Sequence, residues 1–141
     1  MAGSERIAEV VREWVEKAEN DLKNAAHTVK MDEGCPTDTV CFHAQQCVEK
    51  YLKAFLVSKG IDFPNTHDIG ELTALMPRRA VVQLSTEEQR RLVAYATVTG
   101  YPGDYEPVSL SEARLAVKMA RRVRKNIRML LPKNVLRRRR G

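Results

Sequence analysis

The sequence lacks the marks of several classes of protein. It has no glycine-rich phosphate loop, no internal repeat and no alternating strand pattern. No apolar run reaches the roughly 18 residues that cross a membrane, and no basic segment followed by an apolar one opens the chain. We therefore expect an all-α, cytoplasmic protein without a membrane span.

Cysteine is also scarce. The three thiols of Cys35, Cys41 and Cys47 form no C-x-x-C pair, and an odd number leaves at least one unpaired. Two of them fall in a segment predicted to be helical, where a thiol packs as a small hydrophobic group. We expect these residues to fill the core, and we predict no metal and no cofactor.

Length and composition indicate one helical domain. A chain of 141 residues with 43% hydrophobic and 6% aromatic side chains suits a single aliphatic bundle. The patterning predicts an antiparallel bundle of about five helices with an up-and-down core within residues 1–132. Residues 133–141 are predicted to be a basic, disordered tail. The predicted helices span residues 4–31, 39–59, 67–76, 86–99 and 110–131.

The bundle is predicted to form around residues 39–59, a stretch without Gly or Pro. Apolar side chains recur there at three- and four-residue steps and form a stripe that must be buried. They are Val40, Ala44, Cys47, Val48, Tyr51, Leu52, Phe55 and Leu56. The opposite side carries a polar row, with its mixed chemistry, made of His43, Gln45, Gln46, Glu49, Lys50 and Lys53. A face kept for solubility is more often plain Glu and Lys, so this row is the first candidate for a functional surface.

Charge is distributed unevenly. From Ser111 to the end there are 12 Lys and Arg and one acid, a net charge of +11, which leaves −5 for residues 1–110 out of the total of +6. A cationic surface on an acidic body attracts nucleic acid, acidic protein or phosphate, although no aromatic residue there can stack on bases. The alternative is a solvated face with a solubilising tail. The candidate polyanion-binding residues are Arg121, Arg124, Lys125, Arg128, Arg137, Arg138, Arg139 and Arg140.

Several motifs resemble the HEPN domain, a small all-α bundle. The resemblance covers nearly the whole chain from the first helix to Leu131. It is carried by Trp14, Ala18, Asp21 and Leu22, by F-H-A-Q-Q-x-x-E-K-x-x-K-A over residues 42–54, by Thr66-His67-Asp68-Ile69 and by Tyr101-Pro102.

The resemblance implies a homodimer that acts with a small nucleotidyltransferase as a toxin–antitoxin pair and that has a role in nucleotide binding. Combined with the polar row, it gives a set of candidate nucleotide- or partner-binding residues. They are His43, Gln46, Glu49, Lys50, Lys53, His67, Asp68, Tyr101 and Asp104.

The resemblance also implies that many members are ribonucleases with an Arg, four to six residues and then a His. None of His27, His43 and His67 follows an Arg at that spacing, and Gly100 stands where an Arg often precedes the Tyr-Pro pair. Metal-independent RNA cleavage needs a proton-transfer group and a cation at the phosphate. We therefore predict no catalytic residues. The alternatives are a ribonuclease with a rearranged site at His43 or His67, and a basic nucleic-acid-binding module.

Two interpretations of the polar row stay open. It can bind an anion, with His43 and two ammonium groups at phosphate oxygens, or it can form an interface with another bundle, which we favour. For His67 and Asp68 we favour structural roles, contact with a neighbouring helix for the first and the start of a short helix for the second.

Overall fold

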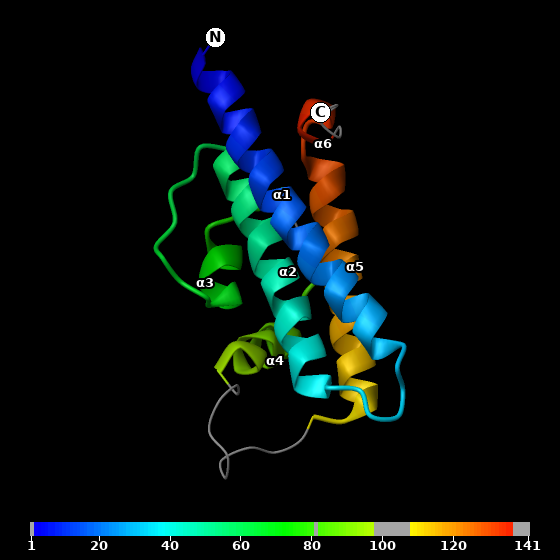
Figure 1. Cartoon of the computed structure of the whole chain (residues 1–141). Helices are drawn as coiled ribbons and strands as arrows, with labels where there is room; N and C mark the ends of the chain where they lie inside the picture. Colours follow the sequence, from blue (N-terminus) through cyan, green and yellow to red (C-terminus); the bar gives the residue numbers. More distant parts are fainter. Residues whose placement is uncertain (1, 81, 98–107, 137–141) are drawn as a thin grey trace.

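The computed structural model describes residues 2–80, 82–97 and 108–136, and every regular element in these ranges is a helix (Figure 1). The predicted all-α helical bundle is therefore confirmed, with one short helix more than expected. The elements are α1 (Ala2–Val29), α2 (Thr37–Ser58), α3 (Ile69–Ala74), α4 (Thr86–Thr97), α5 (Leu110–Leu130) and α6 (Lys133–Leu136).

Helices α1, α2 and α5 lie side by side, and α3 and α4 lie on the other side of α2 (Figure 1). Helix α1 runs antiparallel to α5 (Figure 1). The end of α1 lies beside the start of α5, where the Arg114 guanidinium donates to Asp32 just after α1. Helix α2 runs parallel to α5, since the Thr37 hydroxyl donates to the Val108 carbonyl and Arg128 contacts Tyr51 farther along both helices. Helix α5 therefore starts beside the start of α2 and runs in the same direction, so these two helices depart from the up-and-down alternation.

Helix α2 is the centre of the core. All eight residues of its predicted apolar stripe are no more than 1% exposed. The helix contacts α1, α3, α4 and α5, so neighbours surround it on most sides. Polar side chains on such a helix need hydrogen-bond partners within the protein, because water reaches them poorly.

Helix α4 begins with a capping box. The Ser85 amide donates to Glu88 Oε1 at 3.0 Å, and the Glu88 amide donates to Ser85 Oγ at 3.1 Å. Burial opposes the negative charge of Glu88, but the Ser85 N–H and the Arg122 guanidinium together hold the pKa of this carboxyl below its ordinary value. This corner therefore joins α4 to α5 through Arg122, which contacts both Glu88 oxygens.

Helix α5 begins with half of a capping box. The Glu112 amide donates to Ser109 Oγ at 3.0 Å. The Glu112 carboxylate accepts instead from the Tyr95 hydroxyl of α4 at 3.0 Å. A cap residue thus becomes a link between two helices.

Helix boundaries differ from prediction where another residue makes the cap. Helix α3 was expected to begin directly after Thr66, but Asp68 caps it by accepting from the amides of Gly70 and Glu71. The Thr66 hydroxyl accepts from the Asp68 amide and so supports the cap. Before α2, Gly34 has a φ of +80°, a backbone conformation that does not continue a helix. Helix α2 begins at Thr37, two residues earlier than predicted.

The predicted boundary of the basic tail is wrong. Residues 133–136 form α6, and Val135 is only 5% exposed because it packs against the core. The Arg12 guanidinium of α1 donates to the Asn134 carbonyl at 3.1 Å and joins α6 to the bundle. Arg137, Arg138, Arg139 and Arg140 lie outside the described residues, so their predicted role stays a prediction.

Two of the three thiols are buried as predicted. Cys41 and Cys47 are no more than 1% exposed. Burial raises the pKa of Cys41 to about 12 and raises the pKa of Cys47 as well, so both stay as neutral thiols that fill the core. Within the described ranges, no helix is both long enough and apolar enough to cross a membrane.

Candidate functional site: two buried carboxylate clusters

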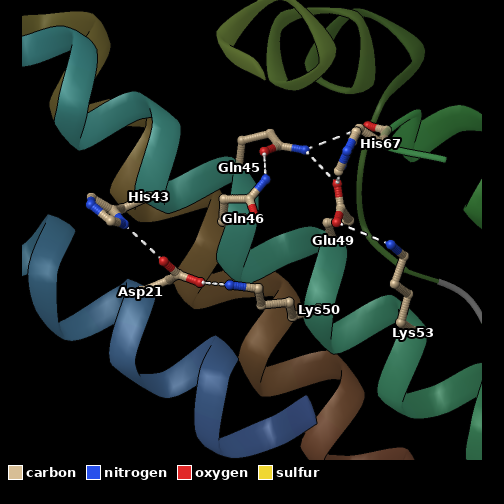
Figure 2. A network of polar contacts seen from close by, with 8 residues as sticks. All are labelled: Asp21, His43, Gln45, Gln46, Glu49, Lys50, Lys53 and His67. Atoms are coloured by element: carbon tan, nitrogen blue, oxygen red, sulfur yellow. Dashed lines mark hydrogen bonds and ion pairs between the residues drawn. The ribbon is translucent and has the colours of Figure 1, made fainter. Parts of the chain in front are cut away.

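The polar row of α2 lies inside the protomer. Gln45, Glu49 and Lys53 are 0%, 3% and 5% exposed, and His43 and Lys50 are half-buried. The expectation that this row faces away from the core is therefore wrong. Helix α1 covers one part of it, and the segment before α3 covers another (Figure 2).

The first cluster, which we call the Asp21 cluster, consists of Asp21, His43 and Lys50. Asp21 belongs to α1 and is 8% exposed. One of its oxygens lies 2.8 Å from His43 Nδ1, and the other accepts from Lys50 Nζ at 2.5 Å. Because His43 and Lys50 stand seven residues apart, they lie two turns apart on one side of α2 and reach the same carboxylate. This cluster pins α1 to α2.

The second cluster, the Glu49 cluster, consists of Gln45, Gln46, Glu49, Lys53 and His67. Glu49 accepts from Lys53 Nζ at 3.1 Å and from Gln45 Nε2 at 3.2 Å, and its Oε1 lies 2.8 Å from His67 Nδ1. Gln46 Nε2 donates to Gln45 Oε1 at 2.7 Å and extends the network (Figure 2). The cluster joins α2 to the segment that leads into α3.

The Lys53 ammonium also lies near two aromatic rings. Its Nζ is 5.5 Å from the centroid of the Trp14 ring and 5.8 Å from that of Phe63. Cation–π attraction therefore adds to the ion pair with Glu49. No buried polar side-chain atom in the part of the chain that the structure describes lacks a hydrogen-bond partner.

In both histidines, Nε2 is the ring nitrogen that remains available to a ligand. Each ring engages a carboxylate through Nδ1, an arrangement that orients the imidazole and leaves Nε2 for a ligand. The His67 side chain is 70% exposed and that of His43 is 28% exposed. Figure 2 shows the two rings at opposite ends of the network, so one protomer does not bring them together at one ligand.

The cations of α5 divide into two kinds. Arg124 Nε donates to both oxygens of Glu19 at 2.9 and 3.1 Å, and Arg128 donates to the same carboxylate at 3.2 Å. Burial opposes the charge of Arg124, but Glu19 raises the pKa of its guanidinium. Arg121 and Lys125 are exposed. Two of the candidate polyanion-binding residues, Arg124 and Arg128, are thus ion-paired within the bundle.

The remaining predicted site residues do not join the clusters. Asp68 serves as the α3 cap. Tyr101 and Asp104 lie outside the described residues. Among the described side chains, no group of three His, Cys, Asp or Glu is placed to hold a metal ion. Asp21 was named above only as part of the resemblance to the HEPN domain. Its position could have marked it as a site residue, because it is an acidic residue within the apolar stripe of α1, directly before Leu22.

A helical bundle with buried ion pairs along its central helix indicates a class of protein but no particular activity. Comparison with known proteins identifies that class. The model of the HEPN domain matches residues 11–130. The chain belongs to the HEPN domain family, as the resemblance predicted. No match is found among the curated proteins.

Two solved structures have the same fold. The protein TT1696 from Thermus thermophilus is 25% identical with a TM-score of 0.70, and the match covers 86% of this chain and 98% of that one. ST0689, an archaeal HEPN homologue, is 26% identical with a TM-score of 0.63, over 85% of this chain and 96% of that one.

The Glu49 cluster yields a prediction about stability. Glu49→Ala leaves the Lys53 ammonium, whose side chain is 6% exposed, without its carboxylate, so we expect the free energy of unfolding to fall by about 3 kcal/mol. Urea denaturation followed by circular dichroism measures this. Glu49→Met combined with Lys53→Met should recover much of the loss, because no buried charge remains.

His67→Ala is the matched control, because its side chain is 70% exposed, and it should cost less than about 1 kcal/mol. If Glu49→Ala unfolds at the same urea concentration as the wild type, the buried cluster does not stabilise the fold.

Proposed function

We propose that the chain is a non-catalytic interaction module, a homodimer that binds a minimal nucleotidyltransferase in a toxin–antitoxin-like pair. The observation that supports this is the use of the polar row inside the protomer. Lys50 contacts Asp21, and Lys53 is buried against Glu49, so neither ammonium is free to meet a phosphate. A histidine base without a neighbouring free cation is poorly equipped for RNA cleavage.

Nucleotide binding is part of the same proposal at one position. His67 is the exposed member of the Glu49 cluster, and its Nε2 faces away from the hydrogen bond at Nδ1. Because Nδ1 donates its hydrogen to Glu49, Nε2 of the neutral ring is an acceptor, which suits a ribose hydroxyl or a base amino group. The other members of the cluster would act by holding the ring in place.

The proposal predicts a stable complex. Co-expression with a minimal nucleotidyltransferase, taken first from the neighbouring genes, should give a complex that stays together through affinity purification and size-exclusion chromatography with light scattering. The chain alone should have the mass of a dimer. A chain that is monomeric and recovers no nucleotidyltransferase would contradict the proposal.

A ribonuclease is the second candidate, and one observation favours it. The two Nδ1–carboxylate pairs resemble the way in which catalytic histidines are oriented. Dimerisation would have to bring a free cation to one of them, since the lysines beside them are already paired.

Incubation of purified protein with single-stranded RNA in a chelator separates the two candidates. The interaction module predicts no cleavage by the wild type above the buffer control. Cleavage that His43→Ala or His67→Ala reduces by more than about 100-fold, the scale of a lost acid–base group, would favour the ribonuclease. Cleavage unchanged in both variants would indicate a contaminating nuclease.

A further inference from the structure

A groove of about 1230 Å³ runs between α1 and α5 and reaches α6. Figure 1 shows α1 and α5 side by side with α6 near the far end of α5. No residue of the Asp21 or Glu49 cluster lines this groove. It is therefore a second surface, separate from the candidate site described above.

The floor of the groove is apolar. Val15 and Leu22 of α1 and Val135 of α6 contribute to it and are 5–7% exposed. Met129 of α5 also lines the groove and is 77% exposed, the largest exposure among the described large hydrophobic residues. A flexible, exposed Met beside an apolar floor is typical of a surface that packs against another apolar group.

The walls of the groove are cationic. Six Lys and Arg and two Glu line it, a net charge of +4. Glu19 is already paired with Arg124 and Arg128. Arg121 and Lys125 stand four residues apart on α5, and both are exposed without an ion pair to any described residue. Lys23 is likewise exposed on the α1 side. The groove therefore offers free positive charge on both walls.

We propose that this groove binds an acidic amphipathic helix of a partner protein. The apolar face of that helix would lie on the floor, and its carboxylates would meet Arg121 and Lys125 on one wall and Lys23 on the other. Along α1 the lining extends from Arg12 to Ala26, about 21 Å at the helical rise, so the occupant is about four turns long. The inference rests on the proposed function, because it assigns the surface through which the interaction module holds its partner.

Two observations favour a protein helix over RNA. A phosphate backbone gains nothing from the apolar floor and Met129. No aromatic side chain lines it, so bases have nothing to stack on.

Other occupants from this chain fit less well. A second copy placed groove to groove would bring two surfaces of net charge +4 together. The chain's own end, residues 137–141, carries four arginines and is repelled by the same walls.

The probe is a fluorescein-labelled peptide of 16 residues, with Leu at helical positions i, i+3, i+4 and i+7 of each two turns and Glu flanking that face. Fluorescence anisotropy with the full chain should give a dissociation constant in the micromolar range. Arg121→Glu combined with Lys125→Glu should weaken binding at least tenfold. Met129→Ser should weaken it about threefold to tenfold, the scale of one lost apolar contact.

The matched control is Arg78→Glu combined with Arg79→Glu. Both residues are exposed and lie outside the groove, and their replacement changes the net charge by the same amount. Binding within twofold of the wild type is expected. A peptide of the same composition with its Leu residues spread around the helix should bind at least tenfold more weakly.

Four results would overturn the inference. They are no binding of the amphipathic peptide, equal loss in the control variant, tighter binding of a 16-nucleotide single-stranded RNA that Met129→Ser leaves unchanged, and conversion of a dimer to a monomer by the groove variant. The last two would assign the groove to nucleic acid or to a second copy of the chain.

The same variants separate this inference from the proposed function. If the nucleotidyltransferase complex persists in the variant with Arg121→Glu and Lys125→Glu, the groove is not the partner-binding surface, but the proposed interaction module is not contradicted. Peptide binding by a chain that recovers no nucleotidyltransferase would support the groove and contradict the proposed partner.

Discussion

The structure depends on the pairing of carboxylates and cations buried along α2. A helix contacted by four other helices has little surface left for water, yet α2 carries a histidine, two amides, an acid and two lysines between residues 43 and 53. An ionised group buried alone costs several kcal/mol. Asp21 from α1 and His67 from the segment before α3 meet this requirement from outside the helix. Together with Glu49 they determine how α1, α2 and α3 are placed.

This pairing limits what the polar row can do. Each carboxylate contacts one lysine and one histidine, so most of the charge in the row is neutralised within the protomer. Exposed positive charge lies elsewhere, and part of it faces the groove from Arg121 and Lys125 of α5 and from Lys23 of α1. The molecule thus separates a structural polar network on one side of α1 from a cationic, apolar-floored surface on another. That separation is the basis of the proposed interaction module.

The apolar half of α2 could be predicted from the sequence because periodicity alone identifies a stripe that must be buried. The environment of the polar half could not, because six polar residues on a helix look the same whether water or other polar groups satisfy them. The distinguishing residue was Asp21, an acid within the apolar stripe of α1. In the same way, Val135 and Leu136 follow a helix-ending proline and precede four arginines, so composition hid the short α6 that packs on the core. The pairing of Glu19 with Arg124 and Arg128 depended on the approach of α1 to α5, which no local pattern encodes.

The central claim is that the polar row is paired inside the protomer, and a double-mutant cycle between Asp21 and Lys50 tests it most directly. The unfolding free energies of the wild type, Asp21→Asn, Lys50→Met and the double variant are compared at equal protein concentration. The Asp21 and Lys50 side chains are 11% and 20% exposed, so we expect a coupling energy above about 1.5 kcal/mol. A coupling below about 0.3 kcal/mol would mean that the two groups act independently, as solvated surface residues do, and would contradict the account.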